Sequence, residues 1–301
     1  MGISTLTHHR HQASIACVLG LVAFSISSQY VRANVTSANL DLSARPSSAK
    51  PATHLPAITA LSVVASGEEK LELSGRLTQN ATNYADSIDW ILKSSDGQTL
   101  FTGAAQILSL PLQPGNYDVT AHYGNVTFNE NITLPVATAV AINFALDAGA
   151  LRIAPHLSAE GGSSQSAATQ IYALSGDTAG QLAATSVTPG EIINLAAGTY
   201  RVETRFPQGN VEASTTVEVK AGIMRAVDLT LHGSAVEFPS LSADESWTIS
   251  NAAGDKLILA PGVNEAALKP GAYSAETKVG SRILTKSFVV EDGITQRLSL
   301  E

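Results

Sequence analysis

Cysteine is almost absent from this chain of 301 residues, since Cys17 is the only one and lies in an apolar run near the N-terminus. Beyond that run the sequence therefore offers no disulfide and no thiolate ligand for a metal. Small secreted domains of eukaryotes usually depend on disulfides. An exported chain of several domains that lacks them is more typical of bacteria.

Charged residues are also few, at 15% of the chain, and the 26 acids outnumber the 18 bases, which gives a formal net charge of −8. Residues 1–33 contain Arg10 and Arg32 but no acid, so the chain without them loses two positive charges and stands at −10. This balance argues against nucleic acid and against anionic membrane surfaces as partners.

Motifs of the common active sites are missing. The sequence has no Gly-x-Ser-x-Gly, no His-Glu-x-x-His, no phosphate-binding loop and no dinucleotide-binding glycine pattern. The histidines after residue 33 and the closest acidic pairs are dispersed: His54, His122, His156 and His232; Asp86 and Asp89, Asp244 and Glu245, Glu291 and Asp292. We expect solvated side chains there, no catalytic residues, no metal and no cofactor, and therefore a protein that is not an enzyme.

One metal alternative stays open at the predicted joints between domains. Calcium often stiffens arrays of β-domains, and Asp147 or Asp228 would be its ligands here. Such a site needs about six to eight oxygen ligands. The sequence has no Asp-x-Asp-x-Asp cluster to supply them, which makes calcium the less favoured alternative.

Residues 1–33 have the features of a secretory signal peptide. Arg10 precedes an apolar run from Ala13 to Ser28, and residues 30–33 place small or β-branched side chains before a cut after Ala33. The run is short and interrupted, whereas a membrane span needs about 20 apolar residues. We expect a periplasmic or secreted protein; the alternative is an uncleaved segment that anchors the protein in the inner membrane, facing the periplasm.

Residues 34–67 are rich in Ser, Ala, Thr and Pro and almost devoid of aromatic residues. This composition predicts a flexible linker. The stretch Ile58–Val64 carries a weak strand pattern near its end.

A short motif then occurs three times: an apolar residue, a turn with Gly, and a strand that begins at Tyr. The three copies contain Gly115 and Tyr117, Gly198 and Tyr200, and Gly271 and Tyr273. Pro precedes Gly in the first and third copies, and Pro-Gly suits the centre of a type II turn. After each Tyr the residues alternate between apolar and polar, which predicts a strand with one buried and one solvated face.

A second landmark supports the repeat. Trp90, Tyr172 and Trp247 each lie near the start of an earlier predicted strand, 27, 28 and 26 residues before the three tyrosines. Landmarks that keep their separation indicate structural repeats. An aromatic residue on an early strand that faces a tyrosine on a late strand commonly fills the core between two sheets.

Seven short predicted strands per unit, separated by turn signals, indicate an all-β chain of three tandem immunoglobulin-like antiparallel β-sandwich repeats. We place the repeats at residues 68–147, 148–232 and 233–301. Each unit is large enough to bury a modest core without disulfides.

The pattern of an apolar residue, Pro-Gly, Tyr and Val, followed by a hairpin with Gly and a Val-rich strand, resembles the PEGA and carboxypeptidase-regulatory-like families of bacterial envelope proteins. The resemblance covers about residues 69–301. It implies an extracytoplasmic adhesive, scaffolding or carbohydrate-contacting module without catalysis. The literal Pro-Glu-Gly-Ala string is absent from this sequence.

Two kinds of partner fit these features. The first is a protein of the envelope or cell surface, bound through loops or sheet edges by strand addition. The alternative is a polysaccharide such as peptidoglycan, stacked on exposed aromatic side chains, for which Tyr84, Phe101 and Tyr123 are available. An enzyme is the least favoured class.

One charged stretch, Arg201, Glu203 and Arg205, lies on the predicted solvated face of a strand. Pairing with Glu212 or Glu218 on the neighbouring strand explains it, at under about 1 kcal/mol per pair. The alternative is a ligand-facing patch.

Overall fold

The computed structural model describes residues 57–158, 167–242 and 245–299. The predicted signal peptide and most of the predicted linker lie outside these residues. Within them the chain is all-β, and no helix occurs that is long and apolar enough to cross a membrane.

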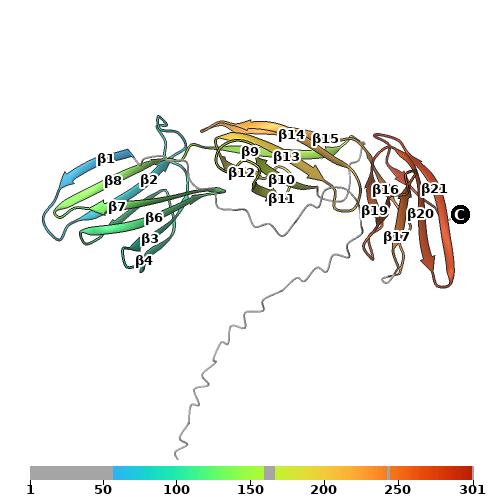
Figure 1. Ribbon diagram of the computed structural model, residues 1–301, viewed down its shortest axis with the longest axis horizontal. Helices are drawn as coiled ribbons and strands as arrows, with labels where there is room; N and C mark the ends of the chain where they lie inside the picture. The colour runs from blue at the N-terminus through green and yellow to red at the C-terminus, as the bar shows by residue number, and fades with distance from the viewer. Residues whose placement is uncertain (1–56, 159–166, 243–244, 300–301) are drawn as a thin grey trace, which may run out of the picture. The chain divides into compact units, whose positions relative to one another are not determined.

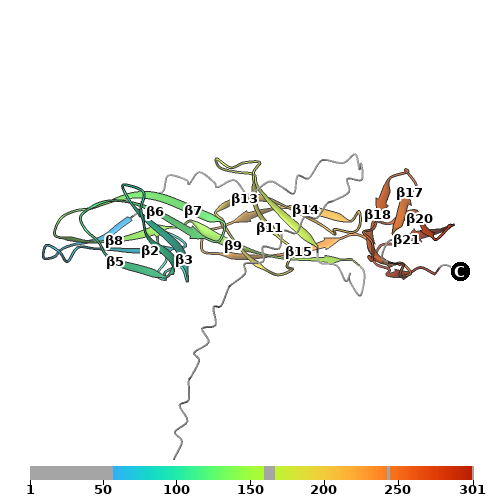
Figure 2. The same ribbon diagram turned by 90° about the horizontal axis from the view of Figure 1, so that it is seen from below.

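The first repeat consists of two four-stranded sheets (Figures 1 and 2). One sheet has the strand order β1-β8-β2-β5, and the other has the order β4-β3-β6-β7. The strands are β1 Ala57–Val63, β2 Lys70–Arg76, β3 Ile88–Ser94, β4 Thr99–Ala105, β5 Ile107–Pro111, β6 Gly115–Tyr123, β7 Val126–Leu134 and β8 Thr138–Ala145.

The second repeat has sheets with the orders β12-β9-β15 and β11-β10-β13-β14. Its strands are β9 Ala148–Leu157, β10 Ala168–Ala173, β11 Leu182–Ser186, β12 Ile192–Ala196, β13 Gly198–Arg205, β14 Glu212–Val219 and β15 Met224–Leu231. The third repeat has the orders β19-β16-β22 and β18-β17-β20-β21. Its strands are β16 Ser234–Glu237, β17 Trp247–Asn251, β18 Lys256–Ile258, β19 Glu265–Leu268, β20 Gly271–Val279, β21 Arg282–Val290 and β22 Gln296–Arg297.

One plan underlies all three pairs of sheets. The sheet that holds the landmark tyrosine, on β6, β13 or β20, is antiparallel throughout. In the other sheet one strand, β2, β9 or β16, pairs antiparallel with the strand before the motif and parallel with the last strand of the repeat. The expected immunoglobulin-like all-β fold is therefore present, with one parallel pairing in each repeat that the antiparallel prediction did not include.

Alternating apolar residues from both sheets form a separate core in each repeat. This follows from the period of two in the strands, which puts every second side chain between the sheets. The largest fully buried side chains are Trp90, Trp247, Leu71, Leu73, Ile88, Leu92, Leu134, Leu146, Leu151, Ile171, Leu195 and Leu231.

Each of the two joints between repeats contains an equivalent backbone hydrogen bond. The Asn125 N–H in the β6–β7 hairpin donates to the Asn194 carbonyl at 3.2 Å, and the Asn210 N–H in the β13–β14 hairpin donates to the Ala267 carbonyl at 3.0 Å. The second joint also contains a fourth apolar cluster, built from Leu157, Ala167, Phe206, Val211, Leu229, Leu231, Ala235 and Ala267.

Three predictions of local structure need correction. The predicted linker at residues 34–67 contains strand β1, which pairs antiparallel with β8; this confirms the weak strand pattern at Ile58–Val64 but not a flexible linker there. The last of the seven strands predicted for the third repeat is short, since β22 comprises Gln296–Arg297. Neither Pro-Gly glycine has the φ of about +80° that the centre of a type II turn needs: Gly115 begins β6 without a positive φ, and Gly271 begins β20 with a φ of 154°.

Candidate functional site

The three landmark tyrosines occupy equivalent positions. Each is buried, with 6%, 6% and 8% of Tyr117, Tyr200 and Tyr273 exposed. Each hydroxyl donates to the backbone carbonyl four residues earlier, at Gln113, at Ala196 (2.8 Å) and at Lys269 (2.9 Å). Burial raises the pKa of Tyr200 to about 12. The motif is thus a turn that is closed by its own tyrosine, and its role is structural.

The second set of landmarks is equivalent only in the first and third repeats. Trp90 and Trp247 are buried and pair with Ala121 and Thr277, each four residues after the landmark tyrosine. Their indole N–H groups donate to the carbonyls of Ala105 and Pro239, both at 3.0 Å.

In the second repeat the equivalent position is Thr169, not Tyr172. Thr169 pairs with Thr204, which again lies four residues after the tyrosine, and the two buried hydroxyls are 3.0 Å apart. Tyr172 lies on the other face of β10, partly exposed, with the Arg201 guanidinium 5.3 Å from its ring centroid. The identification of Tyr172 as a core landmark was wrong, because a shift of an odd number of residues moves a side chain to the opposite face.

Two residues of the charged stretch on β13 pair with each other rather than with the predicted glutamates. Arg201 forms an ion pair with Glu203 at 2.8 Å on its own strand. Glu212 pairs with Lys269 at 3.0 Å and Glu218 with Lys220 at 3.6 Å. Arg201 and Glu203 thus neutralise each other on the surface, while Arg205 lies opposite Glu212 in the β13–β14 register and has no ion pair among those of the described residues.

One arrangement has the atom order of a catalytic triad. The carboxylate of Asp228 lies 3.0 Å from His156 Nδ1, and Thr230 Oγ1 lies 3.1 Å from His156 Nε2. The parallel pairing of β9 with β15 brings these side chains together. The histidine and aspartate side chains are 49% and 80% exposed on an open sheet face. A nucleophilic centre needs a pocket and donors for an oxyanion, and neither of the described depressions includes these residues.

A second His-Asp-hydroxyl group lies at the joint between the second and third repeats. Asp292 accepts from Ser158 Oγ through one carboxylate oxygen, and its other oxygen lies 3.0 Å from His232 Nδ1. The hydrogen bonds from Ser158 and His232 lower the pKa of Asp292. Because the carboxylate stands between the serine and the imidazole, the histidine is not placed to take the serine proton. The group therefore connects the two repeats rather than activating a nucleophile.

The residues proposed for other ligands are not gathered either. In the described part of the chain no three His, Cys, Asp or Glu side chains come together as a metal site, and Asp147 and Asp228 are not joined in one. Phe101 and Tyr123 pack against the first core, and the Arg76 guanidinium lies 5.1 Å from the ring centroid of Tyr84. The three aromatic residues considered for sugar stacking therefore do not form a common platform.

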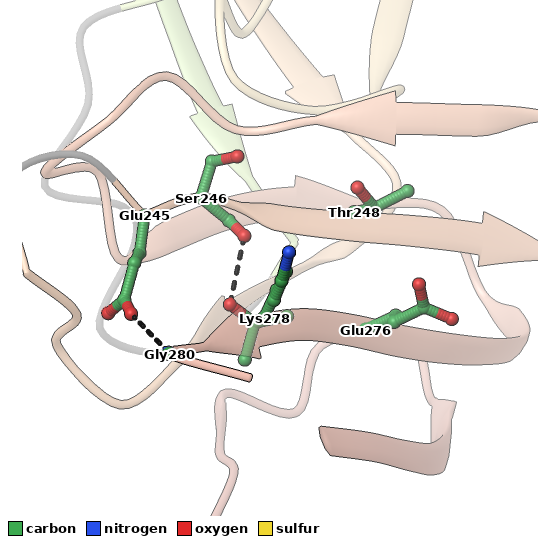
Figure 3. A pocket seen from close by; sticks show the side chains of 7 residues that line it. Glu245, Ser246, Thr248, Glu276, Lys278 and Gly280 are labelled. Carbon is green, nitrogen blue, oxygen red and sulfur yellow. Dashed lines mark hydrogen bonds between the residues drawn. The ribbon is translucent and has the colours of Figure 1, made fainter. Parts of the chain in front are cut away.

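The third repeat has an open depression of about 440 Å³ on its outer surface (Figure 3). Glu245 is engaged there by the backbone, since it accepts from the N–H groups of Ser242 at 3.2 Å and Gly280 at 3.3 Å. Figure 3 shows Glu276 and Lys278 on the neighbouring strand rather than converging on Glu245. This geometry supports the β20–β21 hairpin and brings no acid and base together. The lining residues are Glu245, Ser246, Thr248, Glu276, Thr277, Lys278 and Gly280.

A second depression, of about 380 Å³, lies along β20 and β21. Tyr273, Phe288 and Val289 contribute apolar side chains to it, and the rings of Tyr273 and Phe288 stack with centroids 5.7 Å apart. This groove adjoins the edge strand of the sheet. Sequence reasoning did not find it, although the exposed apolar positions of the final long strand were a signal for it.

No protein-family model and no curated protein matches the chain. Among solved structures, the Bacillus anthracis TIE protein is similar at 17% identity over 70% of this chain and 50% of its own, with a TM-score of 0.24. The minor pilin GBS52 of Streptococcus agalactiae is similar at 13% identity over 54% of this chain and 95% of its own (TM-score 0.29), and a streptococcal ancillary pilin at 9% over 76% and 97% (TM-score 0.27). The chain thus spans half the length of the TIE protein. Since these TM-scores are all below 0.5, the proposals below are argued from this chain's own residues.

Proposed function

We propose that this chain is a non-catalytic structural or interaction protein of the bacterial envelope or cell surface, which binds a protein partner through its sheet edges. The resemblance of its motif to PEGA and carboxypeptidase-regulatory-like modules agrees with this role. The features of residues 1–33 support export to the periplasm or the exterior.

The observation that carries the proposal is the set of edge strands. In each repeat the antiparallel sheet ends on a strand of eight or nine residues, β7, β14 or β21, that has a sheet neighbour on one side only. An edge strand presents backbone N–H and C=O groups to an incoming strand. By contrast, the histidine, acid and hydroxyl groups described above are engaged in structural pairs.

The direct test is to cross-link the exported protein in its native envelope and to identify the products by mass spectrometry. We expect cross-links at the lysines of the edge strands, or at cysteines introduced on β7, β14 or β21. Cysteines introduced on the buried central strands β3 or β10 should give few cross-links. Turnover of a generic ester, phosphate or glycoside substrate by the purified protein would refute the non-catalytic proposal.

The same preparation tests export. The mass of the purified protein should correspond to a chain that begins at Asn34. We do not expect the protein to be retained on polysaccharide or cell-wall material, because the candidate aromatic side chains already pack against the core or contact Arg76. Strong retention that survives edge-strand substitutions would favour the carbohydrate alternative.

A further inference from the structure

The three equivalent edge strands differ in the side chains on their solvated faces. On β7 these residues form polar pairs with β6, including Thr120 with Asn129 at 2.7 Å and Asp118 with Asn131 at 2.8 Å. On β14 they are charged or hydroxylic. On β21 the two ends of the solvated face are apolar, with Ile283 64% and Val289 59% exposed. On β7 these residues are Thr127, Asn129, Asn131 and Thr133. On β14 they are Glu212, Ser214, Thr216 and Glu218, and on β21 they are Ile283, Thr285, Ser287 and Val289.

The third repeat also differs from the other two in the length of its last strand. In the first two repeats the last strands, β8 and β15, have eight residues and lie in the sheets opposite β7 and β14. In the third repeat the last strand, β22, has two described residues. One contact from this region reaches β21: the Gln296 side chain donates to the Val289 carbonyl at 2.6 Å. In Figure 1, β21 is the outermost strand of its sheet, beside β20.

Natural sheets usually protect such an edge with charges, bulges or covering segments. A long regular edge with apolar side chains at both ends is instead a template for another strand. We infer that β21 pairs with β21 of a second copy of this chain, antiparallel and about a two-fold axis. This inference deepens the proposed function by naming both the edge and its partner.

The sequence of β21 favours a second copy because its solvated face is self-complementary. In an antiparallel pair centred on Lys286, Ile283 lies opposite Val289 of the second copy, and Thr285 lies opposite Ser287. Apolar residues thus meet apolar residues, and hydroxyls meet hydroxyls, at all four positions of that face. Cross-strand pairs of this kind are the unit of sheet stabilisation.

The face toward the core fits the same register with one cost. Leu284 lies opposite Phe288 of the second copy, which extends the apolar groove along Tyr273 across the new pair. The two Lys286 residues meet at the axis, and like charges directly opposite each other are destabilising. A single strand pair also buries less area than a standard interface. We therefore expect a weak, concentration-dependent dimer.

The decisive experiment uses single cysteines in a Cys17→Ser background, so that each chain carries only the introduced thiol. Ile283→Cys protein and Val289→Cys protein, of different mass, are mixed at high concentration and treated with a short bis-maleimide. In the proposed register the two sites are opposite each other, whereas two copies of Ile283→Cys place their thiols about 20 Å apart along the strands. The mixture should give at least tenfold more cross-linked dimer than either variant alone.

Sedimentation equilibrium supplies the second readout. Ile283→Lys should raise the dissociation constant of the dimer at least tenfold, and Lys286→Thr should lower it. Thr216→Lys, on the equivalent strand β14, is the matched control and should leave the constant unchanged. A wild-type protein that stays monomeric, a dimer insensitive to Ile283→Lys, or equal cross-linking in all samples would overturn the β21 proposal. None of these outcomes would affect the edge-strand cross-links to other envelope proteins, so the two proposals fail separately.

Discussion

The joint between the first and second repeats and the joint between the second and third have one backbone contact in common but differ in the contacts around it. In both, a hairpin N–H donates to the carbonyl six residues before the next landmark tyrosine: Asn125 to Asn194 and Asn210 to Ala267. At the second joint, Asn210 Oδ1 also accepts from the Lys269 N–H at 2.7 Å, and Asn210 Nδ2 donates to the Tyr273 hydroxyl at 3.0 Å. The first joint has a long side-chain bond, from Asn125 Nδ2 to the Asn194 carbonyl at 3.3 Å, and a backbone bond from the Ala148 N–H to the Leu77 carbonyl at 3.2 Å.

The difference shows how one repeat plan gives two strengths of coupling. At the second joint a polar network surrounds a shared apolar cluster, and the network includes the same tyrosine that closes the turn of the third repeat. Side-chain networks of this kind are worth more than isolated bonds. We therefore expect the second and third repeats to unfold together and the first to unfold more independently.

The largest expected effect comes from removing the landmark tyrosine of the first or the third repeat. Tyr117→Ala and Tyr273→Ala each remove a buried aromatic ring and should cost about 3 to 5 kcal/mol in their own repeat. The Tyr117 change should lower the melting transition of the first repeat alone, whereas the Tyr273 change should also lower that of the second repeat. Differential scanning calorimetry measures both. Identical responses of the second repeat to the two variants would contradict the difference between the joints.

Gly209→Ala tests the backbone contact at the second joint. A Cβ at this position would lie 2.0 Å from the Ala267 carbonyl oxygen, so the backbone segments around residues 209 and 267 must move apart. We expect a loss of about 2 to 3 kcal/mol, within the range of severe single substitutions. The matched variant is Gly124→Ala, where the Cβ meets the Asn194 Cβ at 2.7 Å and φ is 59°. It should also cost about 2 kcal/mol or more, because the clash with Asn194 Cβ adds to the strain of the left-handed backbone, but calorimetry should show no change in the third repeat.

Removing the asparagine side chains gives a smaller effect. Asn210→Ala deletes two hydrogen bonds and should cost about 1 to 2 kcal/mol, because the Lys269 N–H and the Tyr273 hydroxyl each lose a partner. Asn125→Ala deletes one long, exposed bond and should cost a few tenths of a kcal/mol. Hydrogen exchange at the two hairpins reports each loss locally. Equal costs would show that the joints are equally coupled.

The smallest effect appears as a dependence on pH. The folded-state pKa of Asp292 lies below its ordinary value of 3.8, because Ser158 and His232 bond the carboxylate. Its contribution to stability is therefore fully present above that value and is lost as the pH falls through the lower, folded-state pKa. The difference in melting temperature between the wild type and Asp292→Asn should shrink when the pH drops below 3.8. A difference that stays constant through this range would show that the carboxylate does not couple the repeats.

Much of the fold was readable from local pattern. Period-two alternation after Tyr117, Tyr200 and Tyr273 located the strands to within a few residues, because the buried face of a strand repeats every second residue. The tyrosine hydrogen bonds to the carbonyl four residues earlier follow the expectation for a sandwich corner. These features depend on residues close together in the sequence.

What was missed depends on residues far apart. Tyr172 was chosen because it is aromatic. The segment between β10 and β13 is longer than its equivalent in the first and third repeats, and the register places Thr169 opposite Thr204. The Asp228–His156–Thr230 group and the bonds of Asn210 arise only when distant strands or successive repeats meet. The apolar residues of β21 were visible in the sequence, but their place on an edge strand follows from the pairing of β20 with β17 and β21.

The parallel pairing in each repeat also sets an order of events during synthesis. A strand such as β2 has its parallel neighbour only when β8 has been made, about one whole repeat later. Until then, the buried face of the first sheet lacks one of its strands and the unit is incomplete. The chain therefore matures stepwise from its N-terminus, one repeat at a time. In the third repeat the parallel neighbour of β16 is β22, so this sheet is completed only after the whole of the β20–β21 hairpin has been made.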